Sequence, residues 1–221
     1  GDVYKRQVLT GNTYQAAFTE SSPVSTFNSG NQILLNASGS LQIDNRILTY
    51  MDNQWKAENE FSWSDLTGKT NVTAVYPVYP DLDYVQENLY KNNSLEDILY
   101  VKDEFPAGNS IHLQFKHLFS LLTLHLEGNL QTYFQKIEVT CPAVSSIIPK
   151  SAEIVLADNG THTTTIAQVS PSGNYSFIVP PVGNMVIAIN MVTNGKKYTT
   201  QLETKSFTCL LYTSDAADEE D

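Results

Sequence analysis

The clearest alternation of apolar and polar residues lies in the middle of the chain, over residues 111–126. Apolar residues occupy odd positions in the first part of this stretch and even positions in the last part. Each part has the period of two that is typical of a strand with one buried face, but one straight strand would expose one of the two apolar sets. The pattern therefore predicts two strands joined by a bulge or tight bend near residues 118–121. A single buried helix is the alternative.

Similar short apolar runs recur along the chain, separated at short intervals by Asn, Gly, Ser and Pro. No segment sustains a long apolar period of 3.6 residues, so the pattern predicts an all-β protein. A polar loop over residues 81–93 and a helical turn over residues 94–97 are expected to interrupt the strands. The predicted strands cover residues 8–18, 32–35, 45–50, 71–76, 98–101, 135–141, 152–156, 163–169, 175–179, 185–193 and 196–202.

Turn-forming residues suggest where these strands end. Pro142 is expected to end the strand before it, because proline cannot donate a hydrogen bond to a ladder. The sequence Asp-Asn-Gly at residues 158–160 predicts a turn between two strands, and Asn-Gly at residues 194–195 predicts a hairpin. Charge, proline and glycine together at residues 103–109 predict a linker between two domains. Surface turns are also expected at the Asn-x-Ser/Thr sequons of Asn36, Asn71 and Asn159.

The two ends of the chain have an unusual origin. Residues 1–7 read GDVYKRQ, and residues 209–219 read CLLYTSDAADE. Both strings match translations of a common transposase-based sequencing adapter, one in each orientation, so residues 1–7 and 209–221 are expected to be adapter-derived and are excluded from the fold argument. The natural segment is then 8–208, truncated at both ends. Its domains are expected at residues 8–105 and 106–208, with the last strand of the second domain missing.

This trimming changes the charge and the cysteine count. The net charge of −11 becomes −7 once the +1 of residues 1–7 and the −5 of the residues after Thr208 are left out. The balance stays acidic, and Arg46 is the one remaining arginine, which argues against nucleic acid or an anionic membrane as a partner. Cys141 remains as the single cysteine, so no disulfide is predicted, and we expect it to be a small buried residue.

Three histidines in the central stretch, His112, His117 and His125, raise the question of a metal site. Metal ligands must converge on one point, whereas His112 and His117 face opposite sides of a strand. His117 follows the buried face and is predicted to be a hydrogen-bonded core histidine. The sequence contains no nucleophile elbow, complete P-loop or calcium loop. It therefore predicts no catalytic, cofactor-binding or metal-binding residues, and no enzyme.

Large aromatic residues gather near predicted loops. Tyr76, Tyr79 and Tyr84 surround two prolines, and Trp55 follows a predicted turn. Exposed tyrosines on a loop can stack on sugars or anchor a partner, but a core-capping role is the interpretation we favour, because tyrosine is commonly half buried. Trp55 is expected to seal the end of a core.

Short motifs also occur in a characteristic order. Trp55 precedes Thr73-Ala74-Val75-Tyr76-Pro77, Asp97-Ile98-Leu99-Tyr100-Val101 and the most specific one, Leu113-Gln114-Phe115-Lys116-His117, and Ile178-Val179-Pro180-Pro181 and Tyr198 follow. In this order the chain resembles the fimbrillins, the pilin subunits and fimbrillin-like (Mfa-like) lipoproteins of Bacteroides-type anaerobes, over nearly all of residues 8–208. One departure is Asn31, where the family has Asp. The residues expected to form the family-motif core are Trp55, Tyr76, Pro77, Leu99, Tyr100, Phe115 and His117.

The resemblance implies two tandem transthyretin-like (Greek-key) β-sandwich domains. It implies export to the cell surface as a lipoprotein of the outer membrane or fimbrium, with a lipidated cysteine upstream of residue 8. In polymerising members of the family, a trypsin-like protease removes the first strand and a strand of the next subunit fills the groove, which builds a filament. No processing site is identified here, because Arg46, the first arginine after the expected first strand, lies within a later strand.

The expected function is therefore a structural subunit of a pilus, with other pilin subunits as partners through a donor strand. The alternative is a non-polymerising surface lipoprotein that acts as an adhesin or glycan-binding module, with host or bacterial surface ligands as partners. An alternating apolar strand in the natural C-terminus would favour the first function.

Overall fold

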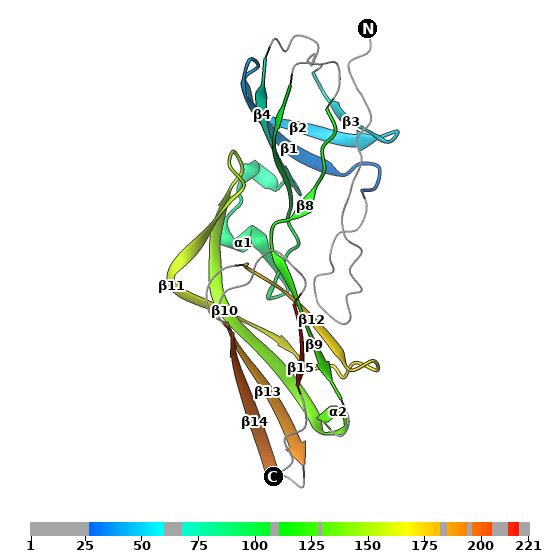
Figure 1. Cartoon of the computed structure of the whole chain (residues 1–221), viewed down its shortest axis with the longest axis vertical. Helices are drawn as coiled ribbons and strands as arrows, with labels where there is room; N and C mark the ends of the chain where they lie inside the picture. Colours follow the sequence, from blue (N-terminus) through cyan, green and yellow to red (C-terminus); the bar gives the residue numbers. More distant parts are fainter. Residues whose placement is uncertain are drawn as a thin grey trace.

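The computed structural model describes residues 27–59, 68–106, 111–127, 130–181, 185–193, 196–204 and 212–216. Within these residues nearly all regular structure is β-strand, which confirms the predicted all-β class. The molecule is elongated, with one large sheet from the N-terminal half at one end and two sheets from the C-terminal half at the other (Figure 1). The predicted strand over residues 8–18 and the predicted turn at residues 194–195 lie outside the described residues.

The N-terminal sheet has six strands in the order β3-β2-β1-β4-β7-β8, and every neighbouring pair is antiparallel. The turn between β2 and β3 places Asp52 and Asn53 at φ values of 52° and 59°, which suits the hairpin geometry that short polar residues tolerate. The strands are β1 (Gln32–Gly39), β2 (Ile43–Met51), β3 (Gln54–Ala57), β4 (Thr70–Tyr76), β7 (Leu99–Phe105) and β8 (Lys116–His117).

One face of this sheet carries the first core cluster. Alternate residues of its strands point into the cluster, as the period of a strand requires. The ring of Phe27 packs against this cluster, with ring centroids 4.8 Å from Trp55, 5.2 Å from Tyr76 and 5.0 Å from Phe115. Trp55 is 3% exposed, so the prediction that it seals a core is confirmed. The other fully buried members include Ile33, Leu35, Val72, Ala74, Leu99, Val101 and Leu113.

The C-terminal half is a β-sandwich whose two sheets have the orders β11-β10-β13-β14 and β12-β9-β15. The second core cluster fills the space between them. The two α-helices among the described residues span four residues each, too short to cross a membrane. The elements are β9 (Ser120–Leu126), α2 (Leu130–Tyr133), β10 (Phe134–Ile148), β11 (Glu153–Ile166), β12 (Asn174–Val179), β13 (Met185–Thr193), β14 (Lys196–Thr204) and β15 (Tyr212–Ala216).

Two predicted strand ends in this half are wrong. Strand β10 continues through Pro142, because Pro142 lies at a shift in the β10–β11 register, where a missing N–H is tolerated. Strand β11 continues through residues 158–160, where a turn between two strands was predicted. Pro142 pairs with Thr161 and Val144 pairs with Leu156, so the Asp-Asn-Gly sequence lies in a wide bulge of one strand, with Asn159 at a φ of 51°.

A third core cluster joins the two halves. Leu34 and Val75, on the second face of the N-terminal sheet, share it with Val144, Ile147 and Ile178 of the C-terminal sandwich. The long β10–β11 hairpin reaches toward the N-terminal sheet to make this contact (Figure 1). We call this third cluster the waist.

The chain between β4 and β7 supplies the rest of the waist. It contains a 3₁₀ turn η2 (Pro80–Leu82), helix α1 (Gln86–Leu89) and a small hairpin of β5 (Tyr90–Lys91) and β6 (Ser94–Leu95). The helical turn predicted over residues 94–97 is wrong. Asn92 and Asn93 adopt positive φ values and turn the chain back on itself, so Ser94 and Leu95 pair as a strand.

The central stretch passes from one core to the other. The predicted bend is confirmed, because β8 ends at His117 and β9 begins at Ser120, with no helix over the stretch. The first predicted strand is only partly correct, because residues 111–115 pair with no described strand and the ladder is limited to Lys116 and His117. The first three apolar residues of the stretch (Ile111, Leu113 and Phe115) lie in the first cluster and its last three (Leu122, Leu124 and Leu126) in the second, whereas Leu118, Phe119 and Leu121 belong to the waist. The crossing between the two cores therefore lies at residues 118–119. The domain boundary after residue 105 stays a prediction, and residues 111–117, which it assigns to the second domain, pack with the N-terminal sheet.

Candidate functional site: the motif residues, the strand edges and a pocket

The motif residues meet where the N-terminal sheet approaches the waist. Tyr76 pairs with Leu99, and Leu99 pairs with His117, which makes one row across β4, β7 and β8. Tyr100 lies in the neighbouring row, and a cis peptide bond joins Tyr76 to Pro77. Phe115 and Trp55 belong to the aromatic cluster around Phe27. Six of the seven residues thus take part in a core cluster or in the crossing between cores, and Pro77 is half-buried beside them. Their common role as a family-motif core stays a prediction.

A buried histidine–carboxylate pair lies at the same crossing. The Nδ1–H of His117 donates to the two carboxylate oxygens of Asp97 at 2.9 and 2.8 Å. The side chains are only 9% and 4% exposed. The prediction of a hydrogen-bonded core histidine is confirmed, and Asp97 is the partner that the sequence did not reveal.

The other histidines point elsewhere. His112 is exposed, and His125 lies on β9 with its Nδ1 2.6 Å from Asn174 Oδ1. Within the described part of the chain, no three His, Cys, Asp or Glu residues are placed to hold a metal ion. Cys141 is buried and free, and burial raises the pKa of its thiol to about 12.

The loop tyrosines are built into the waist. Tyr84 is 3% exposed and its hydroxyl donates to the carbonyl oxygen of Pro77 at 2.6 Å. The hydroxyl of Tyr79 donates to Glu96 Oε2 at 2.7 Å. Burial raises the pKa of Tyr84, and burial together with the Glu96 carboxylate raises that of Tyr79. The core-capping interpretation is therefore confirmed for Tyr84, and Tyr76 and Tyr79 are partly buried.

Two strand edges are candidate sites for another strand. On β9, Leu122, Leu124 and Leu126 point into the second cluster, and one edge of the strand pairs with β12. The other edge pairs with β15 in parallel, and this is the single parallel pair among the described strands. An edge of this kind presents a row of backbone N–H and C=O groups that a strand of any origin can satisfy.

The second edge belongs to β7. Strand β8 pairs with Leu99 and Tyr100 alone, so within the described residues the outer edge of β7 from Val101 to Phe105 has no ladder partner. Val101 and Phe105 point toward the first cluster, whereas Lys102 and Glu104 lie on the opposite face. Exposed charges on an edge strand oppose unspecific pairing.

A pocket of about 370 Å³ lies where the tip of the β10–β11 hairpin meets the second face of the N-terminal sheet. Asn36, which was predicted to mark a surface turn, lines this pocket from within β1 and is 5% exposed, so that prediction is wrong. The neighbouring residues are all apolar (Ile33, Leu34, Leu35 and Ala37). One polar residue inside such a run was the signal that could have identified Asn36 as a buried, specific group.

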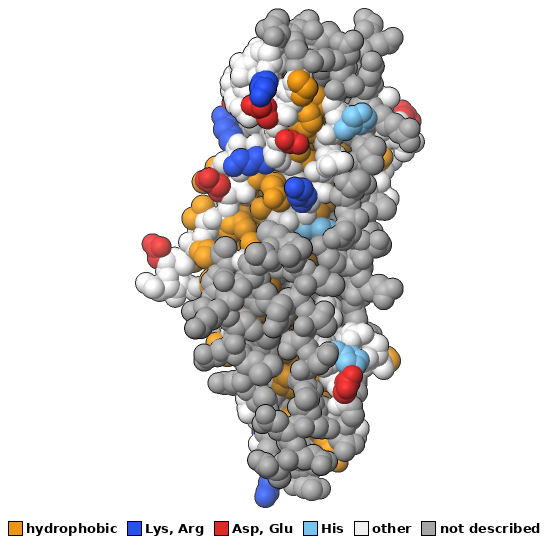
Figure 2. Space-filling view, viewed as in Figure 1, with side chains coloured by type: hydrophobic (Ala, Val, Ile, Leu, Met, Phe, Trp, Pro, Cys, Tyr) orange, Lys and Arg blue, Asp and Glu red, His pale blue; other side chains and the backbone are white. Residues whose placement is uncertain are grey.

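Charge on the outside is mixed. Figure 2 shows Lys, Arg, Asp and Glu side chains interspersed over the N-terminal half, and the face drawn there has no continuous patch of one sign on its described residues.

The fold defines a class: an elongated all-β protein with a C-terminal sandwich. A family model described as "Fimbrillin-like" matches residues 9–212, so the chain belongs to the fimbrillin-like family. The comparison with curated proteins finds no relative of the chain.

Two solved structures are similar over nearly the whole chain. One, described as a "putative cell adhesion protein" from Bacteroides ovatus, is 14% identical with a TM-score of 0.57, and the match covers 96% of this chain and 92% of that one. The other, with the same description, from Bacteroides uniformis, is 12% identical with a TM-score of 0.60, and the match covers 98% and 95%. At these identities the similarity shows the fold.

Proposed function

We propose that the protein is a structural subunit of a bacterial surface pilus and that it joins other pilin subunits by β-strand addition. Membership of the fimbrillin-like family carries this proposal. The outer edges of β9 and β7 support it, because each is a place where backbone hydrogen bonds from a second chain can extend a sheet. Head-to-tail addition at such an edge does not close and therefore produces a filament.

The parallel strand on β9 gives the proposal a specific form. Strand β15 comes from residues 212–216, within the segment that we expect to be adapter-derived. If that segment is foreign, the same edge of β9 belongs to a natural strand in the native pilus. Its alternate side chains would then pack beside Leu122, Leu124 and Leu126, which sets the register of the pairing. We also propose that the subunit reaches the cell surface through a lipid anchor upstream of residue 8.

The test uses the complete gene product, cloned from the source DNA so that both true ends are present. The purified precursor is treated with a trypsin-like protease and followed by size-exclusion chromatography and electron microscopy. We expect oligomers and filaments after cleavage, and none in the untreated control. A cleaved protein that stays monomeric, with cleavage verified by mass, contradicts the proposal of strand addition.

A second candidate function is a non-polymerising surface adhesin, and the pocket beside Asn36 favours it. This function requires a ligand site but no open strand edge. A monomeric precursor that is never cleaved and still binds a ligand would support the adhesin over the pilus subunit.

A further inference from the structure

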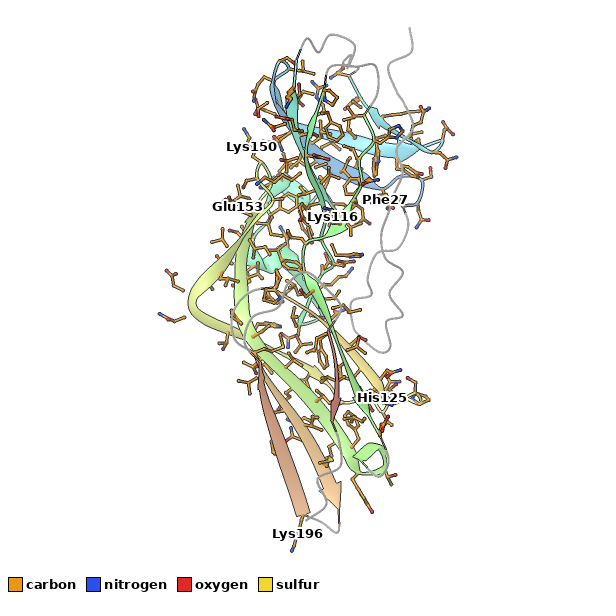
Figure 3. The ribbon with its side chains drawn as sticks, viewed as in Figure 1. Phe27, Lys116, His125, Lys150, Glu153 and Lys196 are labelled. Carbon is orange, nitrogen blue, oxygen red and sulfur yellow. The ribbon has the colours of Figure 1, made fainter. Side chains whose placement is uncertain are left out.

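The pocket beside Asn36 exists because the second face of the N-terminal sheet changes character along its strands. Near the waist this face is apolar, with Leu34 and Val75 covered by the C-terminal sandwich. Further along β1 and β4 the same face carries Asn36 and Thr73. The hairpin tip with Lys150 overhangs this polar part (Figure 3). At the waist, apolar side chains pack against each other. Between the hairpin tip and the polar part of the sheet they do not, and a pocket lies there instead.

The orientation of the Asn36 amide is fixed by its neighbours. The β1–β2 ladder has a register shift between Leu35 and Ala37, which places Asn36 opposite a bulge of β2 at Asp44 and Asn45. There its Oδ1 accepts a hydrogen bond from the backbone N–H of Asn45 at 2.8 Å. Since that N–H can only donate, the atom beside it must be the oxygen, and Nδ2 is the group left over. Nδ2 is buried and has no hydrogen-bond partner.

A second buried polar group lines the same pocket from the other side. Ser151 belongs to the turn of the β10–β11 hairpin, and its Oγ is also buried without a partner. Leaving a buried donor unsatisfied is unfavourable, and such groups in native structures call for an explanation. Two of them in one pocket, on separate elements, are satisfied together by a molecule that offers oxygen acceptors to both.

The charges that line the pocket nearly cancel, with three carboxylates (Asp44, Asp103 and Glu104) and two lysines (Lys102 and Lys150). Asp44 pairs with Lys150 at 2.7 Å, and Glu104 pairs with Lys69 at 2.9 Å. The hydrogen bond from Lys150 is the main reason that the pKa of Asp44 is lowered. Beyond these charged groups the walls offer amide and hydroxyl groups. Such walls favour a neutral ligand with several hydroxyls over an ion. The groups concerned are those of Asn36, Ser38, Asn71, Thr73 and Ser151.

We propose that this pocket binds a neutral, hydroxyl-rich small molecule of the size of one sugar residue. Its volume lies within the range of small-molecule sites. A sugar hydroxyl both donates and accepts, so it can receive hydrogen bonds from Asn36 Nδ2 and Ser151 Oγ. The ion pair of Lys150 and Asp44 connects the hairpin tip to β2, with side chains 58% and 53% exposed, so it can open to admit the ligand. The proposal does not depend on the pilus function.

The experiment uses the full 221-residue chain labelled with ¹⁵N. D-glucose, D-galactose, D-mannose and N-acetyl-D-glucosamine are titrated one at a time, with glycine and acetate as charged comparison ligands. We expect at least one sugar to shift the Asn36 side-chain amide signals saturably, with a dissociation constant on the order of 1 mM. Glycine and acetate are expected to leave these signals unchanged.

Two substitutions locate the site. Ser151→Ala removes a hydroxyl that has no partner, so thermal stability should not fall, whereas sugar affinity should fall roughly tenfold. Asn36→Asp keeps the oxygen that accepts from Asn45 but removes the Nδ2 donor. Because this variant also loses the Asn36 amide signal, its binding is read from the backbone amide signal of Asn45, and it should be weakened similarly. Ser145→Ala, on the same hairpin but outside the pocket, is the matched control and should bind like the original chain.

Three outcomes would overturn the proposal. If none of the four sugars shifts the Asn36 signals, the pocket is a hydrated cavity. If binding is unaffected by both Ser151→Ala and Asn36→Asp, the sugar binds elsewhere. If glycine or acetate binds and the sugars do not, the pocket selects charged ligands.

Discussion

The first and second core clusters differ in how their rings are arranged and in their supports. Most buried members of the first are aliphatic, but a group of contacting rings packs there: Phe27 contacts Trp55, Tyr76 and Phe115. Among the described residues one sheet and the segment at 111–115 supply its buried members. The second lies between two sheets, is mainly aliphatic, and has one stacked ring pair, Phe134 and Tyr175, with centroids 4.8 Å apart.

This difference shows how one chain can stabilise two cores by separate means. Edge-to-face rings have specific geometry and each buries a large area, so a few of them can organise a cluster that chain segments outside the strands complete. Aliphatic residues on two facing sheets instead interdigitate through regular alternation. The waist connects the two, because Leu34 of β1 and Val144 of β10 belong to the same buried cluster. We therefore expect the two cores to unfold as one cooperative unit.

The largest effects should come from removing one ring from each core. Phe115 and Phe177 are each 1% exposed, so Phe115→Ala and Phe177→Ala should each lower the free energy of unfolding by about 3–5 kcal/mol. Urea unfolding is followed by tryptophan fluorescence, which reports on the N-terminal half that holds both tryptophans, and by far-ultraviolet circular dichroism.

The comparison between the two probes tests cooperativity. If the cores unfold together, both probes shift by the same amount in both variants. If Phe177→Ala lowers the midpoint by circular dichroism but leaves the fluorescence midpoint in place, the cores are independent and the waist does not couple them. Leu34→Ala, at the waist, is then measured with the same two probes. The probe whose midpoint falls identifies the half that the waist stabilises.

A smaller effect is expected at the crossing between the cores. Asp97→Asn weakens the hydrogen bonds that the Nδ1–H of His117 donates to a buried carboxylate, and should lower the free energy of unfolding by about 2 kcal/mol. A double-mutant cycle with His117→Gln isolates the interaction, because each single change removes the same pair. Additive losses from the two single substitutions would show that the pair does not stabilise the crossing.

The sequence predicted best what depends on neighbouring residues. The change of parity in the central stretch is a local pattern, and it correctly located the bend between β8 and β9. The β2 and β4 strands and the burial of Trp55 and His117 were predictable for the same reason.

Predictions that depended on distant partners were wrong or absent. Pro142 and residues 158–160 looked like strand ends. In the structure both belong to one irregular part of the β10–β11 ladder, because Pro142 pairs with Thr161 and the next pair is Val144 with Leu156. Asp97 was placed in a predicted helical turn because its real partner, His117, lies 20 positions away. The pocket could not be predicted, because it forms only where the hairpin tip of one half meets the sheet of the other.

The smallest expected effect is a pH dependence of stability that comes from a residue of the second core, Cys141. Burial raises the pKa of the Cys141 thiol from its ordinary 9.0 to about 12, so the unfolded chain loses this proton first as the pH rises. The stability that this group contributes is complete below about pH 9 and is lost progressively toward about pH 12. Between about pH 8 and pH 10 we expect a loss of roughly 1 kcal/mol, which urea unfolding at each pH measures. Cys141→Ala should flatten this decline, and an equally steep decline in that variant would show that the thiol is not its source.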